Sequence, residues 1–205
     1  MKLFFIVAIL FIAINNYALD SLSVIKNLQN KFNTVQDFKS SFKQTTNKSF
    51  DDSELTLSGT FYYKKKNKFK IDLKNILLVS DGISIWNFDK RLNRVVINKI
   101  DENQSFLNLD DIINNYPELC TSNLLKENSD SKFYAVSLKP KNNNLEFESA
   151  TLWIDKNYIL TKIKILDSSG SEYFVELSNI KLNQNLSDAE FVFITPEACK
   201  VIDFR

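Results

Sequence analysis

The sequence predicts a mainly β protein with some helix: an unclosed antiparallel β-barrel of about ten or eleven strands, with helices acting as a lid or plug over its hollow. Three observations lead there. Apolar residues alternate with polar ones over most of the chain, which is typical of half-buried strands. Turn-forming residues separate these runs. Helical spacing of apolar residues occurs in only two places, so helices cover the sheet and do not alternate with its strands.

The run 55–88 is the centre of this pattern. A first strand ends at a turn formed by Lys66 and Asn67, a second strand follows, and Asp81-Gly82 predicts a tight hairpin before the return strand. One face of these strands is apolar and the opposite face is charged, which predicts a sheet with one apolar, aromatic-rich side. The apolar set is Leu55, Leu57, Phe61, Tyr63, Phe69, Ile71, Leu73, Trp86 and Phe88.

Further alternating runs extend the sheet on both sides of this centre. One begins at Phe38, before the central run. The later ones cover 95–97, 133–138, 146–154, 159–166 and 173–180, with turn chemistry between the last four.

Two segments have helical periodicity instead. Residues 21–32 predict an amphipathic helix with Asp20 or Ser21 as its N-cap, and its apolar stripe needs the concave face of the sheet. Residues 101–120 predict a second helix, stopped by Pro117. This second helix is either an ordinary core helix or a movable lid; its apolar positions are Phe106, Leu109, Ile112, Ile113 and Tyr116.

The N-terminus resembles an export signal. Lys2 precedes an apolar stretch from Leu3 to Ile14, and Ala18 is a small residue suited to cleavage. We therefore expect residues 1–18 to be a signal peptide and 19–205 to form a single domain. Without Lys2, 25 basic residues face 25 acidic ones, so the charge balance gives no reason to expect nucleic acid.

The chain contains no histidine, which closes off imidazole-based catalysis and His-ligated metal sites. Asp110 and Asp111 are adjacent, but neighbours on a helix point about 100° apart and do not form an acid/base pair. We expect no catalytic residue, no cofactor, no metal and no enzymatic activity. A carboxylate enzyme is the weakest alternative.

The two cysteines are a disulfide candidate. An exported chain with only Cys120 and Cys199 is more typical of a disulfide than of a metal site. Two buried thiols are the alternative.

Several short motifs, spread in order over nearly the whole predicted domain, resemble the LolA family of periplasmic lipoprotein carriers. They are Phe38-Lys39-Ser40-Ser41-Phe42-Lys43-Gln44, Ser58-Gly59-Thr60-Phe61-Tyr62-Tyr63-Lys64, Val79-Ser80-Asp81-Gly82 with Ile85-Trp86, and Asp188-Ala189-Glu190-Phe191-Val192-Phe193 with Thr195-Pro196. The resemblance implies a monomeric periplasmic chaperone. Such a carrier takes lipoprotein acyl chains from an inner-membrane ABC transporter and passes them to an outer-membrane receptor.

The resemblance also implies site residues. Acyl chains would contact Leu57, Phe61, Phe69, Ile71, Trp86, Phe88, Phe106, Leu109, Ile112 and Ile113, each of which is about as readily an ordinary core residue. Family members carry a Lys-Arg-Pro stretch whose Arg holds the lid; here Lys65 and Lys66 stand at the Arg and Pro positions. Lys65 is thus either a lid latch or a side chain extending to solvent.

Two further alternatives stay open. The same cavity would serve a periplasmic binding module for another amphiphile, such as a glycolipid. The basic cluster Lys64, Lys65, Lys66, Lys68 and Lys70 is either a solvated turn or a docking patch for an acidic loop of the transporter.

Overall fold

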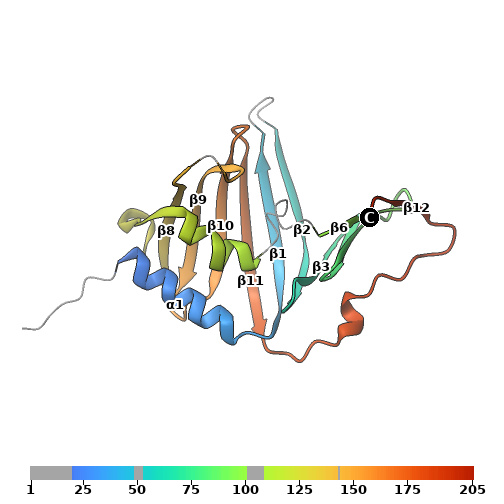
Figure 1. The fold of residues 1–205 in the computed structure, drawn as a ribbon, viewed down its shortest axis with the longest axis horizontal. Helices are drawn as coiled ribbons and strands as arrows, with labels where there is room; N and C mark the ends of the chain where they lie inside the picture. The colour runs from blue at the N-terminus through green and yellow to red at the C-terminus, as the bar shows by residue number, and fades with distance from the viewer. Residues whose placement is uncertain (1–19, 49–52, 101–108, 143) are drawn as a thin grey trace, which may run out of the picture.

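The structure, a computed structural model, describes residues 20–48, 53–100, 109–142 and 144–205. Within them, twelve strands form one curved sheet in the order β12-β6-β5-β4-β3-β2-β1-β11-β10-β9-β8-β7 (Figure 1). Every neighbouring pair is antiparallel except β12 and β6, which run parallel. The bounds are β1 Asp37–Asn47, β2 Glu54–Lys64, β3 Lys68–Leu73, β4 Ile76–Asp81, β5 Ser84–Asp89, β6 Arg94–Lys99, β7 Cys120–Leu124, β8 Phe133–Pro140, β9 Phe147–Asp155, β10 Leu160–Asp167, β11 Glu172–Leu182 and β12 Lys200–Asp203.

The sheet is open, because β7 and β12 are its two edges and do not pair with each other. This confirms the predicted fold class. β7 and β12 were not among the predicted strands: the sequence of β7, CTSNL, lacks a run of apolar alternation, and β12 has only four residues.

The first helix, α1, covers Ser21–Thr34, two residues more than expected. Asp20 caps it, because its side chain accepts a hydrogen bond from the backbone N–H of Ser23 at 2.8 Å. Its buried residues are Ser21, Val24, Ile25, Leu28 and Phe32, so the helix has an apolar stripe as expected, although Leu22, one of the positions expected on it, is 68% exposed. None of the helices in the described residues is long and apolar enough to cross a membrane.

The second helical segment runs from Leu109 to Leu119 within the described residues. It contains a π-helical turn, η1 (Asp111–Asn115), followed by one α-turn, α2 (Tyr116–Leu119). The expectation that Pro117 stops the helix is wrong by about two residues, because the helical segment continues past Pro117 through α2 to Leu119. Two short 3₁₀ turns complete the helical content: η2 (Lys126–Asn128) and η3 (Asp188–Phe191).

The predicted hairpins of the central run are present. Lys66 and Asn67 both have positive φ between β2 and β3, and Gly82 has φ +96° between β4 and β5. These two turns lie against each other: a Cβ on Gly82 would come within 2.4 Å of the carbonyl oxygen of Lys66. Any other residue at position 82 would meet both a strained backbone and a clash.

Apolar side chains form two clusters on opposite faces of the sheet. The larger one gathers α1, the segment 109–119 and one face of β1–β5 and β8–β11. The smaller one consists of Phe88, Val95 and Ile97 with Leu77, Trp86, Phe193 and Cys199, and it is covered by the segment that follows β11. We call the face with α1 the concave face and the other the convex face.

The predicted disulfide is wrong. Both cysteines are free: Cys120 is buried in the larger cluster at β7, and Cys199 packs against the smaller cluster next to β12. β7 and β12 are opposite edges of a twelve-stranded sheet, too far apart for the short Cα separation that a disulfide requires. Burial raises the pKa of the Cys120 thiol.

Candidate functional site

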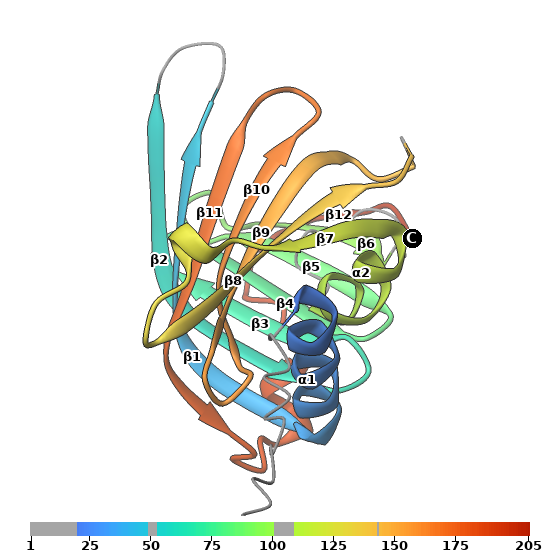
Figure 2. The same ribbon diagram turned by 90° about the vertical axis from the view of Figure 1, so that its left-hand side faces the viewer.

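The concave face is roofed by two helical segments. Figure 2 shows α1 and the segment that ends in α2 beside each other in front of the sheet. The roof packs on the sheet through apolar side chains, since Val24, Leu28, Ile112 and Ile113 are all nearly fully buried in the larger cluster. The predicted helical lid is therefore present as a structural element.

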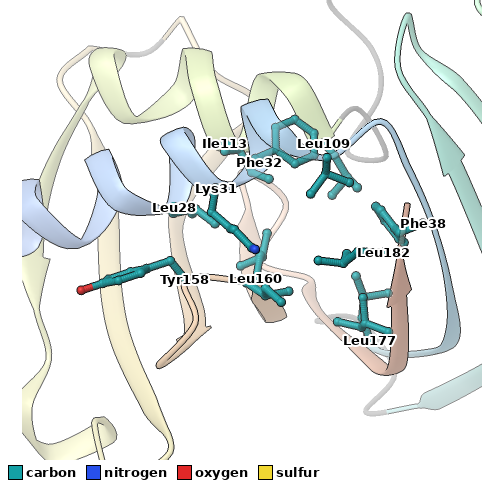
Figure 3. Close-up of a pocket in the computed structure, with 13 residues that line it drawn as sticks. Leu28, Lys31, Phe32, Phe38, Leu109, Ile113, Tyr158, Leu160, Leu177 and Leu182 are labelled. Atoms are coloured by element: carbon teal, nitrogen blue, oxygen red, sulfur yellow. The ribbon is translucent and has the colours of Figure 1, made fainter. Parts of the chain in front are cut away.

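An apolar pocket opens beneath this roof (Figure 3). Its walls come from α1, the segment 109–119, the start of β1, the β9–β10 turn and the end of β11. The lining residues are Leu28, Lys31, Phe32, Val35, Phe38, Leu109, Ile113, Tyr158, Ile159, Leu160, Leu177, Ile180 and Leu182. The Tyr158 hydroxyl points away from the centre of the pocket. Lys31 supplies the one charged group among these lining residues.

The pocket is small in this conformation, with a volume of about 40 Å³. One water needs roughly 10–15 Å³ on this scale, so the space equals about three waters. A long hydrocarbon chain does not fit unless the roof moves. The pocket leads directly into the larger cluster, because its lining residue Phe38 packs edge-on against Phe61 with 5.3 Å between ring centroids.

A hydrogen bond joins the sheet to the second roof segment. The phenol of Tyr63 on β2 donates to Oδ2 of Asp110 at 3.0 Å. Burial, reinforced by the negative charge of Asp110, raises the pKa of Tyr63, so the phenol keeps its proton and remains a donor. Tyr63 also stacks on Phe38 at 5.2 Å, which fixes the ring beside the pocket.

The two roof segments are joined to each other through Gln29 of α1. Its side-chain amide donates to the carbonyl of Ile113 at 3.1 Å and lies 3.5 Å from that of Asn114. Pro117 has no N–H for the carbonyl of Ile113, four residues earlier, and the π-helical turn relieves the resulting misfit. The irregular helix thus exposes a carbonyl that α1 uses as an attachment point.

Lys65 has a definite partner among the described residues. Its ammonium donates to the carbonyl of Asn33 at 2.7 Å, in the last turn of α1. A cation at that position also complements the negative end of the helix dipole. Lys65 therefore holds the first roof helix to β2, and the bond from β2 to the second roof segment comes from Tyr63, which was not singled out as a latch.

Most of the predicted acyl-contact residues lie on the concave face. Phe61, Phe69, Ile71 and Ile112 are buried in the larger cluster and Leu57 packs against it, whereas Leu109 and Ile113 line the pocket itself. Phe106 lies outside the described residues. The structure thus brings the concave-face set together around one core, but only two of its members line the pocket.

Trp86 and Phe88 are placed differently, and their assignment to the cavity needs correction. Both point to the convex face, where the ring of Phe193 lies 6.3 Å from Trp86 and 5.6 Å from Phe88. Ile85, of the opposite parity, packs against the larger cluster. Alternation shows which residues of a strand share a face but not which face is concave.

The remaining pocket residues were not predicted as site residues. Leu28 and Phe32 fell in the predicted helix 21–32, and Leu177 and Ile180 in the predicted strand 173–180. Their convergence depends on β1 pairing with β11, which are more than a hundred residues apart in the chain. No local pattern in the sequence predicts the pairing of β1 with β11.

The basic cluster of the β2–β3 hairpin is partly neutralised within the chain, because three of its five lysines pair with two carboxylates. On the convex face, Lys64 and Lys68 pair with Asp188, and Lys70 pairs with Glu190. Hydrogen bonds from Lys64 and then Lys68 lower the pKa of Asp188 to about 2. These lysines attach the C-terminal segment, so a docking patch made of the whole cluster would first have to release it.

Comparisons with known proteins agree with this geometry. The family described as "Outer membrane lipoprotein carrier protein LolA" matches residues 33–194. An outer-membrane lipoprotein carrier protein of Wigglesworthia glossinidia brevipalpis is 31% identical over 92% of this chain and 91% of its own length. One of Haemophilus ducreyi is 24% identical over 98% of this chain and 94% of its own length.

Two solved structures share the fold. An uncharacterized conserved protein from Thermus thermophilus has a TM-score of 0.55 at 12% identity, covering 89% of this chain and 98% of its own. The lipoprotein LppX of Mycobacterium tuberculosis has a TM-score of 0.52 at 11% identity, covering 81% and 96%. At these identities the likeness concerns the fold alone.

Proposed function

This chain belongs to the outer membrane lipoprotein carrier (LolA) family, and from that membership we propose that it is a lipoprotein chaperone. It takes up the acyl chains of lipoproteins that leave the inner membrane and delivers them to the outer membrane. The proposed seat of the acyl chains is the pocket beneath α1 and the segment 109–119.

The observation that carries this proposal is an apolar pocket continuous with the core and closed by a roof with few polar attachments. Twelve of the thirteen lining residues are aliphatic or aromatic. On the concave face the incompletely filled core and the binding site are one region, so a chain that enters the pocket meets the rings of Phe38 and Phe61 next.

The energetics of carrying an acyl chain require such a surface. Each exposed methylene costs ~0.8 kcal/mol, so a sixteen-carbon chain represents about 12 kcal/mol of hydrophobic free energy. Aromatic and aliphatic walls offset that cost during transit. They hold the chain without directional bonds, which permits release to an acceptor.

Uptake requires the roof to move. The pocket of about 40 Å³ has to widen, and several side-chain hydrogen bonds oppose this: Tyr63 to Asp110, Gln29 to Ile113, Lys65 to Asn33, Lys141 to Glu118, and the bonds between Ser21 and Ser122. Each is a single side-chain bond, of the kind that contributes about 0.5–3 kcal/mol. Burial of one acyl chain, at about 12 kcal/mol, is of the same order as the sum of these bonds.

The setting proposed for this carrier is the periplasm, reached through the export signal expected in residues 1–18. Its proposed partners are lipoprotein acyl chains, an inner-membrane lipoprotein-releasing ABC transporter and an outer-membrane receptor, and it acts as a monomer. The names of the relatives support the lipoprotein cargo.

A release assay tests the function. Vesicles containing the ABC transporter and a triacylated lipoprotein are given ATP and the purified chain, and lipoprotein in the soluble fraction is measured. We expect a soluble complex with the wild-type chain. Leu177→Trp, which fills the pocket, should reduce it severalfold, and Phe174→Trp, on the convex face of the same strand, should not.

Lipoprotein that stays in the vesicles despite a folded wild-type chain would contradict the proposal. Mass spectrometry of material that co-purifies with the chain separates the alternative: a glycolipid or another amphiphile in place of lipoprotein would support a different binding module with the same pocket.

A further inference from the structure

Lys31 stands out among the residues that line the pocket. It lies in the last turn of α1, and its side chain extends so that the ammonium reaches the space near Leu160 and Leu182 (Figure 3). Among the described residues, no acidic side chain lines the pocket with it. A cation therefore points into a site whose other walls are apolar.

This ammonium has no ion pair or hydrogen bond within the part of the chain that the structure describes. Some lysines near the pocket do have partners: Lys65 donates to Asn33, and Lys64 and Lys68 share Asp188. The position of Lys31 near the C-terminus of α1 suits the helix dipole, but a side chain directed to solvent would suit it equally. The dipole therefore does not account for the inward direction.

An apolar pocket with one inward cation complements an amphiphile of matching polarity. We propose that this pocket also binds a single hydrocarbon chain that ends in a carboxylate, with the chain along Phe38 and Leu182 and the carboxylate paired with Lys31. The inference rests on the proposed function in taking this pocket as the acyl seat. The proposal adds the free fatty-acid anion as a ligand class. In the amide- or ester-linked chains of a lipoprotein, the corresponding carbonyl carries no charge.

The pairing gains strength from its surroundings. A charge-assisted hydrogen bond is stronger than a neutral one, and apolar walls lower the local dielectric compared with water. The hydrophobic tail would contribute to binding through the apolar walls, and the anionic head through its pairing with Lys31. A neutral alcohol with the same tail keeps the first contribution and loses the second.

The test compares dodecanoate with dodecanol at about pH 7, where the carboxylate is ionised. Binding to the purified chain is measured below the aggregation limit of each ligand by native mass spectrometry and by calorimetry. We expect the wild-type chain to bind dodecanoate at least about fivefold more tightly than dodecanol. This is the affinity ratio that one charge-assisted bond at a partly exposed site would give.

Three variants make the comparison specific. Lys31→Met keeps the apolar stem and should bring the two affinities together by weakening dodecanoate alone. Lys31→Arg should retain the preference. Lys26→Met removes an exposed lysine from the same helix and should change neither ligand.

Two outcomes would overturn the inference: equal affinities for both ligands in the wild-type chain, or a preference for dodecanoate that persists in Lys31→Met. If neither ligand binds while lipoprotein release proceeds, the inference fails and the lipoprotein function stands. If both ligands bind with the expected ratio and release fails, the anion site stands without the carrier function.

Discussion

The two apolar clusters of this sheet share strands but differ in what covers them. β5 contributes Ile85 to the concave cluster and Trp86 and Phe88 to the convex one. The convex cluster is sealed by the chain's own C-terminal segment, which ends as strand β12 of the same sheet. The concave cluster is roofed by helical segments that add no strand to the sheet and are attached to it by apolar packing and a small set of hydrogen bonds.

This contrast indicates which side of the molecule opens. The convex cover adds ion pairs from Asp188 and Glu190, and the buried carboxylate of Asp37 accepts backbone N–H bonds from Gln184 and Leu186. The concave roof leaves a partly empty pocket beneath it. We therefore propose that one face of the sheet acts as a permanent wall and the other as a compartment with a movable cover.

The largest expected effect comes from breaking the permanent cover. Phe191 in η3 is 1% exposed and η3 packs on β3 and β4, so Phe191→Ala should lower the free energy of unfolding by about 3–5 kcal/mol. Val192→Ala, at a side chain 60% exposed, should change it by less than about 0.5 kcal/mol. Denaturant unfolding measures both. Equal small losses would mean that the C-terminal segment is not a structural cover.

An intermediate effect is expected at the movable roof. Tyr63→Phe removes only the hydroxyl that bonds Asp110, a bond to a charged acceptor worth about 1.5–3 kcal/mol. Loading of a fluorescent acyl probe, followed by stopped flow, should become about tenfold faster, with a modest loss of stability. Tyr62→Phe, on the convex parity of the same strand, is the matched control. A loading rate unchanged by Tyr63→Phe would show that this bond does not hold the roof.

The smallest effect concerns Ser40, whose hydroxyl is buried without a hydrogen-bond partner among the described residues. It lies opposite Phe61 in the β1–β2 register, on the concave face. Ser40→Ala should raise the free energy of unfolding by about 1 kcal/mol, because an unsatisfied buried hydroxyl costs about 1–3 kcal/mol. Ser41→Ala, which loses the bond from Asn179, should not raise it. A destabilised Ser40→Ala would mean that the hydroxyl is satisfied in solution.

Local chemistry was enough to predict much of this fold. Asp20 as a cap, the turn at Lys66 and Asn67, and Gly82 in its hairpin each follow from the conformations that short segments prefer. The open antiparallel sheet and its helical cover follow from the periods of the apolar residues. The edge strands β7 and β12 were missed, because one is polar and the other is very short.

The site was predicted less well, since it depends on long-range pairing. The sequence shows that Trp86 and Phe88 share a face, but only the position of Phe193 shows that this face is convex. Leu177 and Leu182 reach the pocket because β11 pairs with β1. Lys65 was singled out through the family resemblance, but its partner Asn33 depends on where α1 ends.

Hydrogen–deuterium exchange on the empty and the acyl-loaded chain tests the central claim most directly. If the concave roof is the part that moves, loading should change exchange in residues 21–34 and 109–119 and leave 186–204 unchanged. Altered exchange confined to 186–204, with a roof that exchanges identically in both states, would contradict the account.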